Sequence, residues 1–232
     1  MTSKTHSTLT LLPSLWLHGA GLTDATWRDV VVDMPLAKTP NLPGTGNPAR
    51  VERYADALQH LAPDGAVLVG HSLGGMVALE LAARTRPAAL VLIEAVPTVV
   101  DTFFGRIAGR LLPAVLRRIS PGRLAGLVGL GEPEIVAKEL RAQIPCWSAE
   151  AIADQMCAAA VYDGRYLLSA IAAPTLLVDG QRNRATRRGM EAFEIGIIGS
   201  ELLRLDGGHN LPLEMPDALR EHIDDFLKRR LN

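Results

Sequence analysis

The stretch Gly70-His71-Ser72-Leu73-Gly74 has the pattern G-x-S-x-G. An apolar run at 66–69 precedes it and a helix-like run at 76–83 follows it. A strand, a sharp turn and a helix in this order would hold Ser72 in a strained, exposed position. A side chain at 70 or 74 would collide with a neighbouring element, which explains the glycines. The alternative is a glycine-rich turn with a surface serine, but the flanking elements favour a nucleophile.

A serine hydroxyl needs a base within hydrogen-bond reach. His209 lies between glycines and Asn210, after the last predicted strand and before the last predicted helix. This is where the chain order serine, acid, histidine places the base. The other histidines lie near the terminus, on predicted helices or beside the site: His6, His60, His222, His18 and His71. A loop imidazole without a role is the alternative, and the flanking glycines favour a base.

The acid that would orient the base is less clear from the sequence. The loop after the predicted strand 175–179 carries Asn183 where an aspartate is expected. An amide there carries no charge, and such a change lowers kcat by about four orders of magnitude in a serine protease. Glu94 ends an otherwise apolar strand, where a carboxylate is costly without a partner, so we expect it to be the acid. The alternative is a structural carboxylate; Asp179 and Asp206 are weaker candidates.

Acyl transfer also needs hydrogen-bond donors for the oxyanion. We expect these to be the amides of Leu73 and of Ala20, which lies in the loop His18-Gly19-Ala20-Gly21. We further expect Gly19, His71 and Trp147 to contact the substrate. No ligand pair has a spacing suited to a metal site, so we expect no metal.

Composition bounds the class of protein. The 232 residues are 48% hydrophobic and 21% charged, with a formal net charge of -1. These values suit one globular chain with a large core and give no basis for a nucleic-acid or membrane partner. Two cysteines without CxxC spacing do not make a disulfide framework. The N-terminal residues lack an apolar signal-peptide core, so we expect a cytoplasmic protein.

Apolar runs at 15–17, 66–69, 89–93, 174–178 and 202–205 predict strands buried on both faces, which is typical of a parallel sheet. A weaker strand is expected over 36–42. Helices are expected from residue 23 or 24 to 34, over 51–61, after Ser72, and from Pro216 onward. Strands that alternate with helices predict an α/β fold, with a mostly parallel sheet covered on both faces.

The segment 97–172 has a different composition. It is rich in helix formers and interrupted by prolines at 113, 121, 133 and 145. We expect three to five short helices that form a cap over the site, inserted after the strand that ends at Glu94. Residues 1–96 and 173–232 would form the core. Apolar cap residues could line a substrate pocket, although each could equally hold the cap to the core: Phe103, Phe104, Leu111, Leu112, Trp147 and Met156.

The motifs at 18–21, 41–46, 70–75 and 208–209 resemble, in order and spacing, those of the α/β-hydrolase superfamily. The resemblance covers nearly the whole chain and implies the α/β-hydrolase fold and a hydrolase without a cofactor, similar to small carboxylesterases. Two positions depart from the family pattern, Asn41 in the usual D-L-P-G-x-G motif and Asn183 in the acid loop. Some family members carry the acid after the strand that follows the nucleophile's, which supports Glu94.

We therefore expect a serine hydrolase that cleaves small to medium, partly apolar carboxylic esters through an acyl-enzyme on Ser72. Its partner would be a small-molecule ester or related acyl substrate, and its oligomeric state is open. Two alternatives remain at this point. One is a ligand-binding or catalytically weakened protein of the same fold, which the missing aspartate favours. The other is thioester or C–C bond hydrolysis, or a cofactor-free lyase, because pocket shape decides among such reactions.

Overall fold

The computed structural model describes residues 7–44, 49–99, 111 and 114–231. The expected pocket residues Phe103, Phe104 and Leu112 lie outside this described part. Within it, no helix is both long and apolar enough to cross a membrane.

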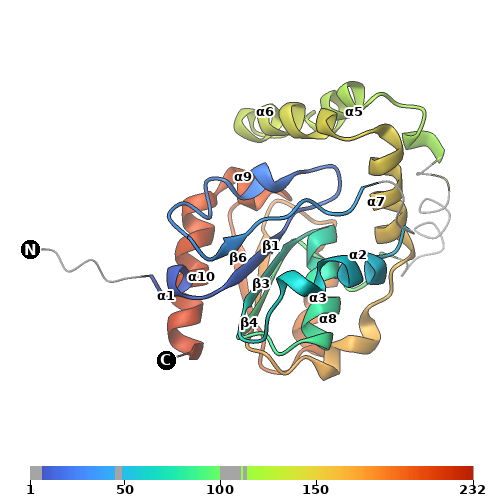
Figure 1. Ribbon diagram of the computed structural model, residues 1–232. Helices are drawn as coiled ribbons and strands as arrows, with labels where there is room; N and C mark the ends of the chain where they lie inside the picture. Colours follow the sequence, from blue (N-terminus) through green and yellow to red (C-terminus); the bar gives the residue numbers. More distant parts are fainter. Residues whose placement is uncertain (1–6, 45–48, 100–110, 112–113, 232) are drawn as a thin grey trace, which may run out of the picture.

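A six-stranded parallel sheet forms the centre of the molecule (Figure 1). Its order is β2-β1-β3-β4-β5-β6, and every neighbouring pair is parallel. The strands are β1 (Ser14–Leu17), β2 (Ala37–Lys38), β3 (Val67–His71), β4 (Ala89–Ile93), β5 (Thr175–Gly180) and β6 (Glu201–Leu205). Because β3 lies between β1 and β4, the loops that follow these three strands meet at one edge of the sheet.

Helices cover both faces of the sheet, as predicted. The strands alternate between two apolar clusters, so that Leu68 packs on one face while Val67 and Val69 pack on the other. The first face is covered by α2 (Val51–Leu58), α3 (Leu73–Arg84) and α8 (Arg187–Gly196). The opposite face is covered by α1 (Thr8–Leu11) and α10 (Pro216–Leu231). A 3-10 turn at Gln59–Leu61 extends α2, and the short α9 (Leu211–Glu214) precedes α10.

Two elements differ from the sequence prediction near the first strand. The helix expected from residue 23 or 24 to 34 is a single 3-10 turn, Asp24–Trp27, followed by turns. Thr23 caps it by accepting from Ala25 N, and Trp27, Val30 and Met34 are buried. The β-branched run at 30–32 disfavours a continued helix. The strand expected over 36–42 shortens to Ala37–Lys38.

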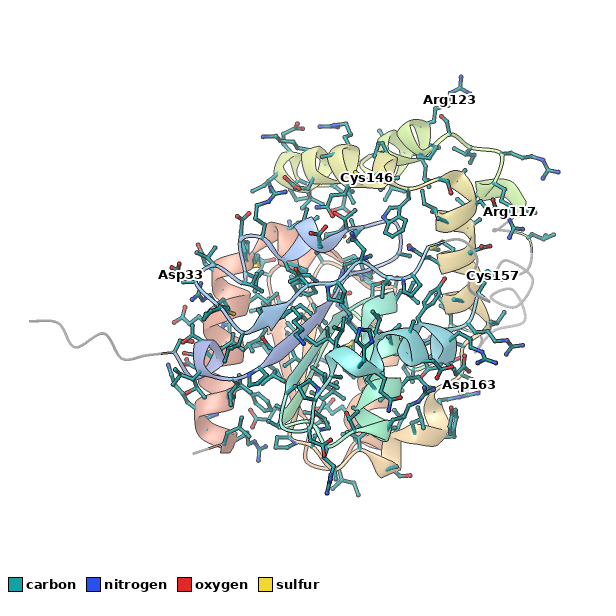
Figure 2. All side chains as sticks on the ribbon, in the orientation of Figure 1. Asp33, Arg117, Arg123, Cys146, Cys157 and Asp163 are labelled. Atoms are coloured by element: carbon teal, nitrogen blue, oxygen red, sulfur yellow. The ribbon has the colours of Figure 1, made fainter. Side chains whose placement is uncertain are left out.

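The segment between β4 and β5 folds as helices over the carboxyl edge of the sheet (Figure 1). We call residues 97–172 the insertion. Its described elements are α5 (Pro121–Val128), α6 (Glu134–Gln143), α7 (Ala149–Val161) and 3-10 turns at Ile144–Cys146 and Arg165–Ala170. Both cysteines lie in the insertion and are free thiols (Figure 2). Polar contacts hold its C-terminal end to α3, where the buried Tyr162 and the exposed Tyr166 both donate to Glu80.

Candidate active site

Ser72 occupies a sharp bend between β3 and α3. Its backbone has φ 54° and ψ -118°, a left-handed conformation that is unusual for a residue with a side chain. The bend brings backbone so close that side chains would not fit at two positions. A Cβ on Gly70 would lie 2.3 Å from Gly74 O, and one on Gly74 would lie 2.1 Å from Leu17 O. The glycines therefore allow the strand, the bend and the helix to pack closely around the serine.

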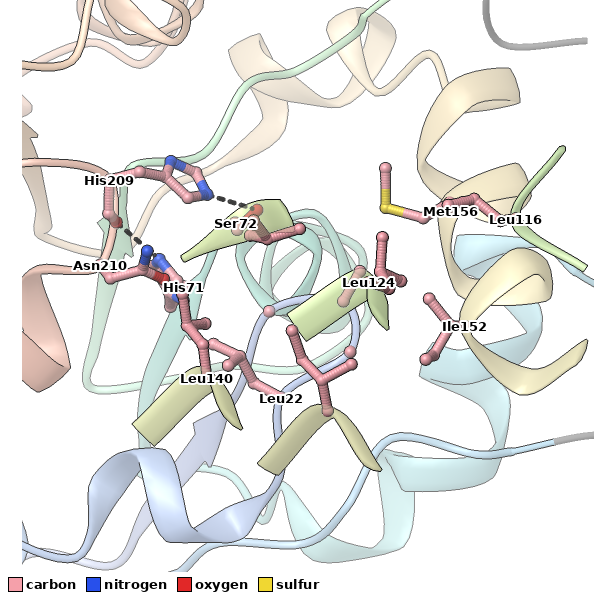
Figure 3. Close-up of a pocket in the computed structure, with 15 residues that line it drawn as sticks. Leu22, His71, Ser72, Leu116, Leu124, Leu140, Ile152, Met156, His209 and Asn210 are labelled. Atoms are coloured by element: carbon pink, nitrogen blue, oxygen red, sulfur yellow. Dashed lines mark hydrogen bonds between the residues drawn. The ribbon is translucent and has the colours of Figure 1, made fainter. Parts of the chain in front are cut away.

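His209 lies directly beside this serine. Its Nε2 atom is 3.2 Å from Ser72 Oγ, across 137 residues of sequence (Figure 3). His71 fixes the backbone of the base, because its Nε2 donates to His209 O at 2.8 Å. Burial, followed by the nearby His209, lowers the pKa of His71 to about 3. His71 therefore stays neutral at pH 7 and supports the base without adding charge to the site.

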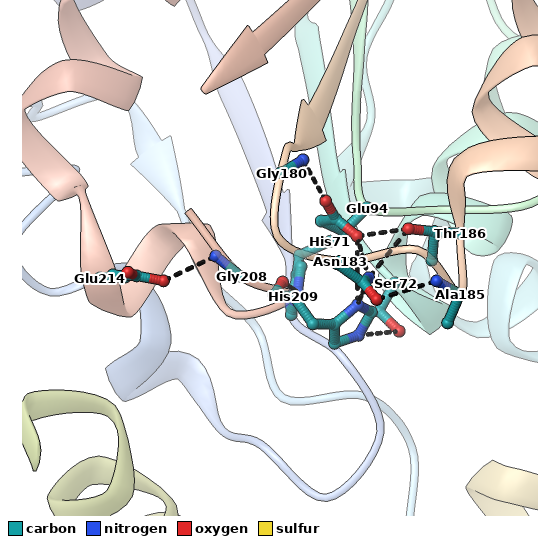
Figure 4. Close-up of polar contacts among 10 residues, drawn as sticks. All are labelled: His71, Ser72, Glu94, Gly180, Asn183, Ala185, Thr186, Gly208, His209 and Glu214. Carbon is teal, nitrogen blue, oxygen red and sulfur yellow. Dashed lines mark hydrogen bonds and ion pairs between the residues drawn. The ribbon is translucent and has the colours of Figure 1, made fainter. Parts of the chain in front are cut away.

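The carboxylate of Glu94 approaches His209 from the other side. Its side chain is fully buried, and Oε2 lies 3.4 Å from His209 Nδ1 (Figure 4). Asn183 and Thr186 also contact Oε2, each at 2.5 Å, while Gly180 N donates to Oε1. The structure thus brings together the three side chains expected to form the triad. Asp206 is exposed and pairs with Arg182, and Asp179 pairs with Arg204 at 3.4 Å.

The two expected oxyanion donors lie beside the serine. Leu73 is the first residue of α3, so its N–H has no partner within the helix. Ala20 lines the same cavity as Ser72, and in the described part of the chain its amide donates to no protein acceptor. Gly19 fits against the bend, since a Cβ there would lie 3.3 Å from Ser72 Cβ. Two backbone amides therefore stand near the hydroxyl without internal acceptors.

His18 holds the loop that carries Ala20. Its Nδ1 donates to Gly19 O at 2.8 Å, and its Nε2 accepts from Leu42 N at 2.9 Å. Together these bonds require a neutral imidazole, because the second nitrogen must keep its lone pair. Burial lowers the pKa of His18 to about 4. The imidazole therefore ties this loop to residues 41–44 at neutral pH.

An apolar cavity of about 370 Å³ opens beside Ser72 (Figure 3). Its floor is polar and comes from the sheet edge, with Ser72, His71 and His209 among the lining residues. The opposite wall comes from the insertion and is aliphatic: Leu116, Leu124, Val128, Leu140, Ile144, Ile152 and Met156. Met156 thus lines the cavity as expected. Gly19 and His71 line it as well.

Trp147 has a different place from the one expected. It is absent from the cavity lining. Its indole Nε1 donates to Leu22 O at 2.7 Å, and its ring lies 6.1 Å from that of His18. The side chain therefore supports the loop behind the cavity wall. The structure thus gives Trp147 a supporting contact outside the cavity lining, and its expected contact with the substrate stays a prediction.

Two glutamines of the insertion were missed from the sequence. Gln155 of α7 is fully buried and accepts from Gly21 N at 2.8 Å, next to Ala20. Gln143 of α6 accepts from Thr23 N at 3.0 Å. Both helices also carry charged residues, so no local pattern marks these two amides, although a buried amide needs a partner. The insertion thus holds the loop after β1 by polar contacts as well as by apolar packing.

A second, smaller cavity adjoins His209. It has a volume of about 240 Å³ and is polar in character, with Glu132, Arg182, Asn183 and Glu214 among its lining residues. Glu214 is fully engaged, since it accepts from Arg182 and from Gly208 N. Within the described residues, no group of three or more His, Cys, Asp or Glu side chains is arranged to hold a metal ion.

Known proteins that are similar in sequence to this chain are named as esterases. A pimeloyl-(acyl-carrier protein) methyl ester esterase of Neisseria meningitidis is 26% identical over 91% of this chain and 92% of its own length. A protein of the same name from Aromatoleum aromaticum is 46% identical, over a segment that covers 35% of this chain and 36% of that protein.

Solved structures agree. A thermophilic esterase from Thermogutta terrifontis, 27% identical, superposes with a TM-score of 0.81 and covers 94% of this chain and 90% of its own. MenH from S. aureus, 18% identical, has a TM-score of 0.84 over 94% of both chains and shows the same fold. The model of the alpha/beta hydrolase family matches residues 15–222. Because this match runs from β1 into α10 and includes both Ser72 and His209, the chain belongs to the alpha/beta hydrolase family.

Proposed function

We propose that this hydrolase of ester bonds works through an acyl-enzyme on Ser72 and takes small to medium, partly apolar carboxylic esters. The observation that carries the proposal is the 3.2 Å approach of His209 Nε2 to Ser72 Oγ at the edge of an apolar cavity of about 370 Å³. The names of the N. meningitidis and T. terrifontis proteins, both esterases, support the reaction class.

In the proposed mechanism, Ser72 Oγ attacks the ester carbonyl while His209 Nε2 takes the hydroxyl proton. The amides of Ala20 and Leu73 stabilise the oxyanion that forms. Glu94 accepts from His209 Nδ1 and stabilises the imidazolium. The intermediate then expels the alcohol, which takes the proton from His209. A water molecule, deprotonated by His209, attacks the acyl-enzyme, and the acid leaves as His209 returns this proton to Ser72 Oγ.

The insertion supports the substrate range. We propose that residues 97–172 act as a cap, since their described aliphatic side chains form the wall opposite Ser72. Such a wall favours an apolar acyl or alcohol group, because burying it releases about 0.8 kcal/mol per methylene. A methyl ester of a medium-length acyl chain fits this description and agrees with the names of two relatives.

Turnover of p-nitrophenyl acetate, butyrate and hexanoate by the wild type and by Ser72→Ala tests the proposal. We expect the variant to lose about six orders of magnitude in kcat, as happens when a nucleophile of this type is removed. Electrospray mass spectrometry should detect the acyl adduct on the wild type alone. Equal rates for the two proteins would exclude Ser72 as the nucleophile.

A ligand-binding or catalytically weakened protein is the second candidate, and Asn183 in the acid loop is the observation that favours it. Labelling by a fluorophosphonate separates the two, since an activated serine reacts and an inert one does not. We expect rapid labelling of the wild type and none of Ser72→Ala. Failure of the folded wild type to label would favour the binding protein.

A further inference from the structure

We propose that Asn183 and Thr186 are positioning residues that hold the carboxylate of Glu94 against His209. The acid then comes from the end of β4, and the amide in the loop after β5 anchors it. This inference rests on the proposed function, in which Glu94 orients the base.

The contacts around Glu94 leave little freedom to its carboxylate. Oε1 accepts from Gly180 N, and Oε2 accepts from Asn183 Nδ2 and Thr186 Oγ1, each at 2.5 Å (Figure 4). A carboxylate is an acceptor only, so three donors from one loop suit it. No Lys or Arg of the described residues forms an ion pair with Glu94; its one ion-pair contact is His209, at 3.4 Å. The loop after β5 therefore sets where this charge lies.

The orientation of the Asn183 amide follows from its other partner. Its Oδ1 accepts from Ala185 N at 3.1 Å, which leaves Nδ2 facing Glu94. A reversed amide would place two oxygens 2.5 Å apart and would lose the bond from Ala185. Asn183 is therefore a donor to the carboxylate, which is the opposite of what an aspartate at this position would be.

The same amide lies close to the base, and its hydrogens decide what it does there. Asn183 Nδ2 lies 3.2 Å from His209 Nδ1. An amide that donates to this nitrogen would force the proton onto Nε2, the tautomer that cannot accept from a serine. Here Nδ2 lies closer to two other acceptors, Glu94 Oε2 at 2.5 Å and Thr186 Oγ1 at 2.9 Å, and donates towards that pair.

What sets the tautomer is therefore the carboxylate of Glu94, which accepts only and lies 3.4 Å from His209 Nδ1. A proton on Nδ1 can be donated to it, and Nε2 then presents a lone pair to Ser72 Oγ. Thr186 and Asn183 hold the carboxylate in this place, because both donate to Glu94 Oε2. The hydroxyl and the amide thus favour the productive tautomer by positioning its acceptor.

The backbone also fits this arrangement. Glu94 has φ 49°, a left-handed conformation that is costly for a non-glycine residue and that persists where surrounding contacts impose it. Its N–H donates to Val178 O at 2.9 Å, which continues the pairing of β4 with β5. The side chain therefore leaves the sheet edge beside the loop that carries Asn183 and Thr186.

The first experiment exchanges the acid and the amide, using Glu94→Gln, Asn183→Asp and the double variant. We expect Glu94→Gln to lower kcat by about 10³- to 10⁴-fold. The double variant restores one carboxylate and one amide in exchanged positions. We therefore expect its kcat to be at least tenfold higher than that of Glu94→Gln. In Asn183→Asp two carboxylates share one proton, so the pH profile of kcat/KM should gain an ionisation. The neighbouring Asp179 is present in the wild type and in all three variants, so its effect on the pH profile is common to the four proteins.

The second experiment tests the hydroxyl with Thr186→Val, which keeps the shape, and Thr186→Ser, which keeps the donor. We expect Thr186→Val to lower kcat about tenfold with KM unchanged. Thr186→Ser, which keeps the hydroxyl, should have an activity close to that of the wild type. The ¹⁵N spectrum of His209 should show the proton move from Nδ1 towards Nε2 in the Val variant. Thr175→Val is the matched control, since this buried threonine lies at the far end of β5 and donates to Ala173 O.

The outcomes separate the two proposals. If Glu94→Gln keeps full activity, Glu94 is not the acid and that part of the proposed function fails. If Glu94→Gln is inactive while Thr186→Val keeps the wild-type kcat and tautomer and the double variant recovers nothing, the positioning role alone is wrong. Thermal unfolding of every variant shows whether it is folded. If Thr186→Val does not fold, the exchange of Glu94 and Asn183 in the double variant still decides the test, and Thr186→Ser shows whether the site tolerates substitution.

Discussion

The two walls of the cavity differ in how they are held. The sheet-edge wall consists of polar groups, each fixed by the backbone or by buried hydrogen bonds, as with Ser72 on its strained bend and Glu94 under three donors. The insertion wall consists of aliphatic side chains that contribute shape alone. Under the proposed function, the first wall supplies the reacting groups and the second selects the substrate by its volume. Substitutions on the two walls should therefore have different kinds of effect.

Gly74→Ala should give the largest effect on the sheet-edge wall. Its Cβ would lie 2.1 Å from Leu17 O, and backbone cannot yield as a side chain does, so α3 must move away from β1. We expect a loss of at least 10³-fold in kcat/KM with p-nitrophenyl butyrate, because a small misplacement of catalytic groups is costly. Gly126→Ala on α5 is the matched control, since its Cβ would meet no heavy atom within 4 Å. Full activity of Gly74→Ala would contradict the close approach.

Acid should destabilise the sheet-edge side through His18. Its folded pKa of about 4 lies below the value of 6.5 in the unfolded chain. The unfolded state therefore binds the proton first, and stability falls as the pH drops from 6.5 towards 4. The loss from this residue is on the order of 3 kcal/mol. Urea unfolding across this range should show a shallower dependence on pH in His18→Asn.

The control for this prediction is the exposed His60→Asn on the turn after α2, which should keep the wild-type slope. His71 also takes up a proton, with its pKa lowered to about 3 by burial, so a residual slope is expected in His18→Asn. An unchanged slope in His18→Asn would show that the loop at 18–21 does not depend on a neutral imidazole.

Much of the sheet-edge wall could be predicted from the sequence, because its signals are local. Five consecutive residues predict the bend at Ser72, and apolar runs predict the buried strands. The contacts of Asn183 could not be predicted, since the orientation of its amide depends on Ala185 and on a strand 89 residues away. The sequence indicated a missing aspartate, whereas the structure has a donor to Glu94 in its place.

The insertion wall was predicted as a helical segment but not in its details. Trp147 was expected in the pocket because it is large and apolar, yet its place depends on how α6 and α7 dock, which no local pattern encodes. Gln155 was missed for the same reason, since its partner Gly21 lies 134 residues away. Local rules also failed over 24–34, where spacing suggested a helix and the β-branched run at 30–32 opposed one.

Gln155→Leu tests the contact through which the insertion holds Gly21, the residue next to Ala20. Removal of the amide leaves Gly21 N–H buried without an acceptor, which costs about 1–3 kcal/mol. We expect kcat to fall about tenfold with KM nearly unchanged, because Ala20 is the neighbouring residue. Gln143→Leu, which affects Thr23 instead, should lower the melting temperature with a smaller effect on kcat. Equal effects of the two variants on kcat would show that the contact at Gly21 has no special role.

The smallest effect should come from the aliphatic side chains, and it should be a change of preference. Ile152 is buried and lines the cavity from α7. Its replacement by alanine makes room, and each further buried methylene of a substrate adds about 0.8 kcal/mol. We therefore expect the ratio of kcat/KM for p-nitrophenyl octanoate over butyrate to rise about fourfold in Ile152→Ala, while kcat for acetate changes little. Ile135→Ala, at an exposed position of α6 outside the cavity lining, should keep the wild-type ratio. An unaltered ratio in Ile152→Ala would place the acyl chain elsewhere, with the polar cavity beside His209 as the next candidate.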